Sequence, residues 1–308
     1  MDELVRLSEI PTAGEKYMLA GWQQWADAGS ISSGLPQYLI DLTGARKIGE
    51  IKPHGFYFFQ IPGTHHFMRP EIKLEEGYRQ SMTVPKNEFY YAGDDEQGLV
   101  IFLGEEPHMN ADRYADAFFD AVEQLGVSRV VAVGGVYGAL PYDKDRDLSC
   151  AYSLVELKSE LENYAVRFSS YEGGTTIGSY LLHQAEPRGI EFCVFYAFVP
   201  AYEFSQGGEY SQGVRIDNDY KAWYDLMRRI NHMFKLGLDL VDLEQKSEEL
   251  IASMDSKLDK LARQLPQLKI RDYLRKVAEE FEERTFMPLS DVWEEELGDL
   301  FEGLDDDE

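Results

Sequence analysis

The pattern of apolar and polar positions divides the chain into two parts. Over the first two-thirds, short apolar runs alternate with amphipathic segments, which is typical of strands connected by helices. The predicted strands are residues 17–22, 47–51, 55–61, 99–103, 129–133 and 190–199, and the predicted helices are residues 30–42, 110–125 and 175–185. An irregular excursion is expected over residues 62–86. This order predicts an α/β fold, a three-layer α/β/α sandwich with a mostly parallel sheet.

The last third has a helical pattern only. A Gly-, Ser- and Gln-rich stretch over residues 205–213 precedes it, and Pro266 separates two apolar stripes that predict an αα-hairpin. We therefore expect a core over residues 1–204, a linker over 205–218, a helical extension over 219–288 and an acidic tail over 289–308. Two interpretations of the extension remain open: it packs on its own sheet, or it contacts a second copy or another protein.

Composition narrows the class of protein. The chain has 308 residues, with 30 Lys and Arg against 56 Asp and Glu, so its net charge is −26. Such a charge repels phosphate backbones and anionic lipid headgroups, so neither nucleic acid nor membrane is an expected partner. The longest apolar stretch, residues 192–202, is too short to span a bilayer. Two distant cysteines and no signal-peptide pattern predict a cytoplasmic protein.

Candidate chemistry lies in four loops that follow predicted strands, where ligands bind in open α/β sheets. These loops cover residues 21–29, 104–108, 134–146 and 171–176. The candidate ligand-binding residues in them are Trp22, Asp27, Glu106, Tyr137, Glu172, Gly174 and Thr175. The first loop precedes a predicted helix, and a small-residue turn at Gly174 precedes another.

Each candidate also has a structural interpretation. Asp27 is either a general base or a cap for the following helix. Glu106 is a candidate acid or base, although Glu105 beside it points the other way on an extended strand. Residues 173–176 either bind an anion through free backbone N–H groups or form a tight turn with a Thr cap. No motif predicts a cofactor or a metal, because His65-His66 lacks a third ligand.

At these four loops the sequence resembles the PAC2 family, named after proteasome assembly chaperone 2. The resemblance rests on stretches in order: Gly21-Trp22 with Asp27-Ala28-Gly29, Glu106-Pro107, Leu125-Gly126-Val127 through Gly135, Tyr171-Glu172-Gly173, Pro200, and Leu236-Gly237-Leu238-Asp239. It implies an α/β/α core similar to nucleoside phosphorylases, a helical C-terminal extension, and self-association, with a trimer as the leading expectation. Some relatives help to assemble the proteasome.

Two features depart from the family pattern. Relatives that enter proteasome pockets end in a hydrophobic-Tyr-any tripeptide, whereas this chain ends Asp306-Asp307-Glu308. Many bacterial relatives carry a Pro-His-Thr-Arg-Pro-like segment where this chain has Pro141-Tyr142-Asp143-Lys144-Asp145-Arg146.

Two functional hypotheses follow. The first is a non-catalytic, homo-oligomeric binding or assembly protein of chaperone type, with a possible protein partner at the helical extension. The alternative is a phosphorylase- or hydrolase-like enzyme that binds a small anion at the strand ends and uses Asp27 or Glu106 as its base.

Overall fold

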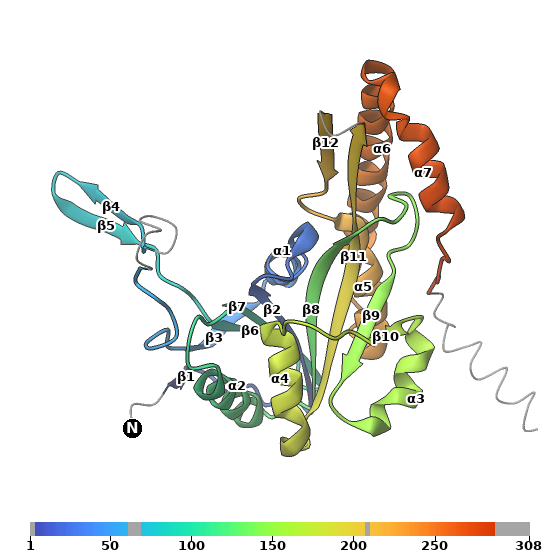
Figure 1. Cartoon of the computed structure of the whole chain (residues 1–308). Helices are drawn as coiled ribbons and strands as arrows, with labels where there is room; N and C mark the ends of the chain where they lie inside the picture. The colour runs from blue at the N-terminus through green and yellow to red at the C-terminus, as the bar shows by residue number, and fades with distance from the viewer. Residues whose placement is uncertain (1–3, 61–68, 207–209, 287–308) are drawn as a thin grey trace, which may run out of the picture.

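The structure is a computed structural model that describes residues 4–60, 69–206 and 210–286. A ten-stranded sheet forms its centre, and four of the strands, in the spatial order β7, β2, β8 and β11, are parallel (Figure 1). They span Gln97–Glu105 (β7), Glu15–Gln23 (β2), Arg129–Gly138 (β8) and Glu191–Gln206 (β11). Their apolar runs are buried, as expected of strands covered on both faces. The predicted α/β class is confirmed.

Further strands extend the sheet on both sides. On one side lie β6 (Glu88–Gly93), β3 (Arg46–Ile51) and β1 (Val5–Leu7), and on the other lie β9 (Leu148–Tyr152) and β10 (Arg167–Phe168). All of them pair antiparallel except β10, which pairs parallel with β9. The sequence pattern missed β6 and β9. Both strands are short, and pairing with the adjacent strands of the sheet, rather than their own pattern of apolar residues, determines their conformation.

Two helical layers cover the sheet. Successive residues of β2 point to opposite faces, so Leu19 joins one apolar core and Ala20 joins the other. The helices of the first layer are α1 (Gly34–Thr43), α3 (Lys158–Leu161) and α5 (Tyr220–Met233), and those of the second are α2 (Ala111–Leu125) and α4 (Ile177–Ala185). Short 3₁₀ turns connect several elements: Ala28–Ser30, Val155–Leu157, Glu162–Tyr164, Glu186–Arg188 and Pro266–Leu268.

The region between β3 and β6 differs from its prediction. The strand expected over residues 55–61 is wrong for the described residues 55–60, which are irregular. The Phe56 side chain is fully buried, and its carbonyl accepts hydrogen bonds from the backbone of His108 and Met109, so this segment is held without strand pairing. Within the expected irregular excursion, β4 (Ile72–Glu75) and β5 (Tyr78–Met82) form a separate two-stranded hairpin.

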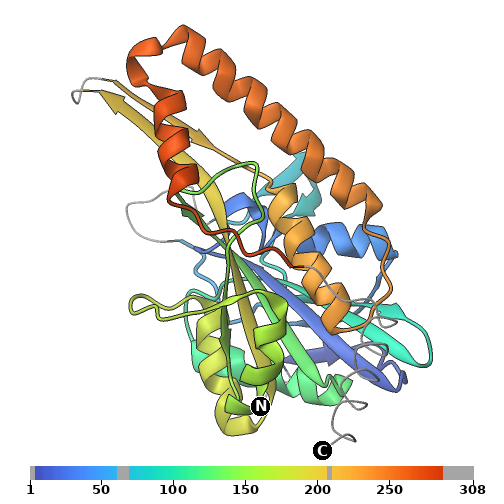
Figure 2. The ribbon, with the colours of Figure 1, turned by 90° about the vertical axis from the view of Figure 1, so that its right-hand side faces the viewer.

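The expected linker also contains regular structure. Strand β11 continues to Gln206 and pairs antiparallel with β12 (Tyr210–Arg215). Figure 2 shows the long helix α6 (Val241–Gln264) and the returning helix α7 (Ile270–Glu279) beside this hairpin. The Tyr273 ring of α7 packs edge-on against Phe204 of β11, with 5.3 Å between centroids. The αα-hairpin is therefore confirmed and packs on its own chain, while the tail from 287 lies outside the described residues.

No helix in the described ranges is both long and apolar enough to cross a membrane.

A buried cluster of charges fixes α5 to the core. Arg146 and Asp219 are both fully buried, and Arg146 Nε lies 2.9 Å from Asp219 Oδ2. The backbone N–H of Arg146 donates to Asp225 of α5 over 2.8 Å, and Asp225 also accepts from Lys221 over 2.6 Å. Burial raises the pKa of the Asp225 carboxyl. The segment after β8 and the first turns of α5 are thus tied together by ionic hydrogen bonds that water does not reach.

Removing one partner of this cluster should be costly. We predict that Asp219→Ala lowers the free energy of unfolding by about 3–5 kcal/mol, because Arg146 then remains buried without its carboxylate. Urea denaturation measures this difference. The matched control is Glu162→Ala, which breaks the exposed Lys158–Glu162 pair and should cost less than about 1 kcal/mol. Equal effects of the two substitutions would contradict the account.

Candidate functional site

Trp22, near the end of β2, and Asp27, in the loop after it, both have structural roles. The Trp22 side chain is fully buried, and its indole N–H donates to the Tyr114 hydroxyl over 2.9 Å. Asp27 accepts hydrogen bonds from the backbone N–H groups of Ser32 (2.7 Å) and Ser33 (3.0 Å) and from the Ser33 hydroxyl (2.6 Å). Trp22 is therefore a core residue, and Asp27 satisfies N–H groups at the entry to α1.

Glu106 connects its own loop with the loop after β2 and with the start of α4. Its Oε1 accepts from the backbone N–H of Ile177 over 2.9 Å, and its Oε2 accepts from the backbone N–H of Trp25 over 3.2 Å. Ile177 is the first residue of α4, so the carboxylate lies at the positive end of that helix. A carboxylate of the chain itself therefore occupies this N–H group, at the helix start for which the sequence left an anion site and a Thr-capped turn open.

The fourth loop ends in a helix cap. Thr176 is the N-cap of α4, and its Oγ1 accepts from the backbone N–H of Ser179 over 3.1 Å. The Thr176 hydroxyl also lies 2.5 Å from the hydroxyl of Tyr196, whose pKa burial raises. Glu172, Gly174 and Thr175 are exposed.

The third loop meets the first at a glycine. Asp27 and Gly135 form a parallel β-bridge, and the Gly135 N–H donates to the Ala26 carbonyl over 2.9 Å. A Cβ added at Gly135 would lie 2.0 Å from the Ala28 carbonyl oxygen, so only glycine permits this approach. Two residues later Tyr137 is exposed, and Arg215 of β12 lies over its ring at 5.3 Å.

The four loops therefore lie together at one end of the strands of the sheet. We call this surface the rim, and it comprises residues 21–29, 104–108, 134–138 and 171–176. Glu106 binds backbone N–H groups of other segments, whereas Asp27 binds those of Ser32 and Ser33, which follow its own loop. Glu105 confirms the expected divergence from Glu106, because it accepts from the backbone of Lys86 instead, over 3.3 Å. Burial raises the pKa of the Glu105 carboxyl.

Other reactive groups are also tied into the structure. His108 Nδ1 accepts from the backbone N–H of Phe58 over 3.1 Å, and burial lowers the pKa of this histidine. Cys150 and Cys193 are buried, which raises the pKa of both thiols and keeps them protonated. Within the described ranges, no three His, Cys, Asp or Glu side chains gather in a way that suits a metal ion. His65 and His66 lie outside those ranges.

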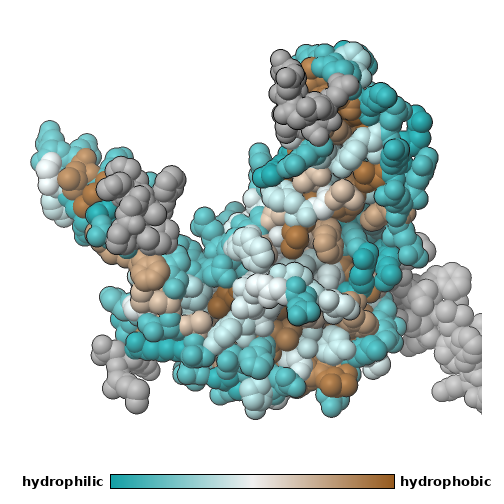
Figure 3. Space-filling view, in the orientation of Figure 1, coloured by the Kyte–Doolittle hydropathy of each residue, from teal (hydrophilic) through white to brown (hydrophobic). Residues whose placement is uncertain are grey.

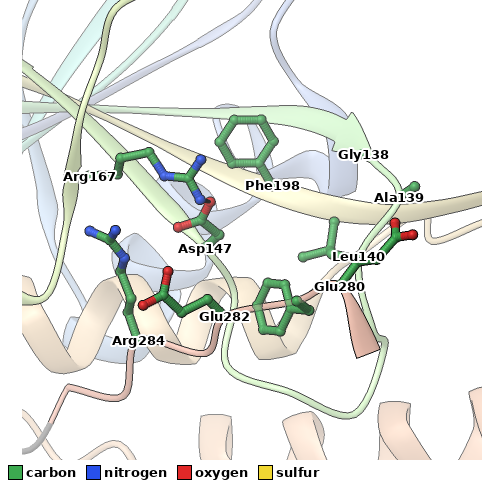
Figure 4. A pocket seen from close by; sticks show the side chains of 10 residues that line it. Gly138, Ala139, Leu140, Asp147, Arg167, Phe198, Glu280, Glu282 and Arg284 are labelled. Atoms are coloured by element: carbon green, nitrogen blue, oxygen red, sulfur yellow. Dashed lines mark hydrogen bonds and ion pairs between the residues drawn. The ribbon is translucent and has the colours of Figure 1, made fainter. Parts of the chain in front are cut away.

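A pocket that the sequence did not predict lies between the end of β8 and the segment after α7. It has a volume of about 530 Å³. Figure 4 shows Asp147, Arg167 and Phe198 of the core together with Glu282 and Arg284 of that segment. Asp147 pairs with Arg167 through one oxygen, while its buried Oδ1 has no hydrogen-bond partner in the described part of the chain. These side chains are distant in the sequence, so only the packed fold brings them together.

The fold and the rim together place this chain in the class of three-layer α/β/α proteins. In its rim, the Glu106 carboxylate connects neighbouring segments through backbone hydrogen bonds. The model of the PAC2 family matches residues 21–258, so this chain belongs to the PAC2 family. A search of curated proteins finds no match.

Three solved structures share the fold. A PAC2 family protein from Streptomyces avermitilis is 22% identical, covering 84% of this chain and 99% of its own, with a TM-score of 0.66. A proteasome-assembly chaperone homologue of Mycobacterium tuberculosis is also 22% identical, covering 78% and 94%, with a TM-score of 0.65. The archaeal proteasome activator PbaB of Pyrococcus furiosus is 17% identical, covering 85% and 99%, with a TM-score of 0.56.

The environment of Asp27 predicts a pH dependence. Burial raises the pKa of its carboxyl above the ordinary value of 3.8, against the opposing effect of its hydrogen bonds with Ser33 and Ser32. A raised pKa in the folded state contributes stability that is full below 3.8 and is lost as the pH rises through the folded-state pKa.

Asp27→Asn keeps an oxygen acceptor for the cap and removes this titration. We predict that the difference in unfolding free energy, variant minus wild type, increases as the pH rises above about 4. This pH is close to the pKa of Asp in the unfolded chain. Urea denaturation at a series of pH values measures the difference. A difference that stays constant with pH, or falls, would contradict the prediction.

Proposed function

We propose that this protein is a non-catalytic, homo-oligomeric binding or assembly protein of chaperone type that acts in the cytoplasm. The observation that carries the proposal is the use of Glu106, whose two carboxylate oxygens accept hydrogen bonds from the amides of Ile177 and Trp25 of its own chain. Family membership supports it, since solved relatives are described as a proteasome-assembly chaperone homologue and a proteasome activator.

The organisation of the chain fits this role. In the proposal, the core over residues 1–204 is a rigid scaffold, and the extension over residues 219–288 widens the surface available to a partner. The buried cluster of Arg146, Asp219 and Asp225 would keep the two parts in one orientation. A scaffold of fixed shape suits a protein that presents a surface to other subunits, because less entropy is lost on binding.

The alternative, an enzyme that binds a small anion at the rim, has less support. Its anion site was predicted at the N-terminus of α4, where the Ile177 N–H group already donates to Glu106. Its candidate base Asp27 already accepts three hydrogen bonds.

The first test is the oligomeric state. We predict that light scattering of the purified chain at micromolar concentration gives a multiple of its 35.3 kDa mass, with three copies as the leading expectation. A mass of one copy at every concentration tested would overturn self-association.

A thermal-shift experiment separates the two functions. With inorganic phosphate or adenosine we expect no change in Tm. A ligand selective for the folded state, present at 100 times its Kd, stabilises by about 2.7 kcal/mol and would raise Tm measurably. Such a rise, abolished by Glu106→Gln, would favour the enzyme.

A further inference from the structure

The hairpin of β4 and β5 stands apart from the rest of the molecule (Figure 1). We call residues 72–82 the arm. Every residue of its two strands is exposed, and the main sheet pairs with neither strand. An isolated two-stranded hairpin is at best marginally stable in water. An exposed arm of this kind therefore gains stability when a further surface covers it.

One face of the arm carries three apolar side chains. Ile72 lies directly opposite Met82, and Leu74, two residues further along β4, lies on the same side. The register shifts between Lys73 and Leu74, so Arg79 pairs with Leu74 at the far end of this face. Ile72, Leu74 and Met82 are 54%, 56% and 47% exposed. Figure 3 shows hydrophobic side chains along the projecting arm. Ser81 pairs with Lys73 on the opposite, polar face.

The positive charge of this region lies at the base of the arm. Residues 52–86 contain five Lys and Arg and three Glu, a net charge of +2, so the remaining residues carry −28 of the total of −26. Within the arm itself Lys73 and Arg79 balance Glu75 and Glu76, whereas the base has Lys52, Arg69 and Lys86 against Glu71. An acidic surface therefore attracts the base of the arm over long range, and other copies of this chain provide one.

The rim has the complementary character. Trp25, Tyr137 and Tyr171 are large exposed aromatic side chains on three of its loops, and Trp25 is 72% exposed. Glu106 and Glu172 add negative charge to the same loops. Aromatic side chains surrounded by polar groups are characteristic of interface centres.

The arm does not cover the rim of its own chain, because both surfaces are exposed in the same molecule. Its base is nevertheless fixed to that rim. The backbone N–H of Lys86 donates to Glu105 Oε1 over 3.3 Å, and the Tyr57 hydroxyl donates to the Glu105 carbonyl over 2.7 Å. From this base the arm projects away from the body of the molecule (Figure 1).

We propose that the apolar face of the arm of one copy packs on the aromatic rim of a second copy. This inference rests on the proposed self-association and specifies the surfaces that produce it. Because the arm and the rim are different surfaces, the contact is heterologous, and copies joined in this way form a closed ring or a filament.

A pair of matched substitutions tests the arm. Leu74→Asp places a charge on the apolar face, and Ser81→Asp places the same charge on the polar face of the same hairpin. We expect Leu74→Asp to weaken association at least tenfold in light scattering across a concentration series, and Ser81→Asp to change it less than threefold. Both variants should keep the wild-type Tm of the core, since the arm is outside it.

Disulfide trapping tests the rim. Leu74→Cys and Tyr171→Cys are prepared as separate proteins, mixed and oxidised; the native Cys150 and Cys193 are buried. We expect a disulfide-linked pair of the two variants, and none when Ser81→Cys replaces Leu74→Cys.

The outcomes distinguish the two proposals. A wild-type protein that stays monomeric overturns the proposed self-association together with this inference. An oligomer unaffected by Leu74→Asp overturns the role of the arm alone. The assignment of the rim is overturned in either of two cases. In the first, Leu74→Asp dissociates the oligomer but Leu74→Cys forms no disulfide with Tyr171→Cys. In the second, Leu74→Cys forms a disulfide only with another copy of itself.

Discussion

The arrangement of the rim depends on one carboxylate. Glu106 follows the end of β7, and its two oxygens bind the backbone N–H groups of Trp25 and Ile177. These groups belong to the loop after β2 and to the first turn of α4, so one side chain fixes three segments that are remote in sequence. A carboxylate at a helix N-terminus is favoured by the helix dipole and by free N–H groups. The interaction that resembles a ligand site is therefore internal.

A second constraint determines where the C-terminal part of the chain lies. Arg146, Asp219 and Asp225 are buried, and a buried ionic cluster is stable only when all its partners are present. Helix α5 consequently has one position against the sheet, and α6 packs on α5, with its Leu243 buried in the same apolar core. Helices α6 and α7 bury their apolar faces on their own chain. In the described part of the chain, the β4–β5 arm instead projects from the body, and its strands do not pair with the main sheet.

The sequence predicted the parts whose periodicity is strong. The buried runs of β2, β7, β8 and β11 and the amphipathic stripe of α2 follow directly from residue pattern. The β4–β5 hairpin was not predicted, because its side chains are all exposed and local periodicity reflects burial. Strand β12 was mistaken for a linker, since its Gly, Ser and Gln residues are typical of loops, and pairing with β11 overrides that preference.

For the site, the sequence identified the correct loops but not the partners of their side chains. The sequence left Asp27 open between a helix cap and a general base, and it could not show that Asp27 accepts from the backbone of Ser32 and Ser33 just before α1. The hydrogen bond between Glu106 and Ile177 joins residues 71 positions apart, and no local pattern contains it. The pocket beside Asp147 and Arg284 likewise exists only after the segment beyond α7 has packed on the core.

Hydrogen exchange at the Ile177 amide tests most directly whether the rim is closed by its own carboxylate. Compared with wild type, Glu106→Ala should accelerate exchange of this amide by roughly tenfold or more, because a hydrogen bond to a charged group contributes about 1.5–3 kcal/mol, while amides near the middle of α2 keep their rates. An Ile177 amide that exchanges equally fast in both proteins would show that Glu106 does not occupy the N-terminus of α4, and would contradict the account.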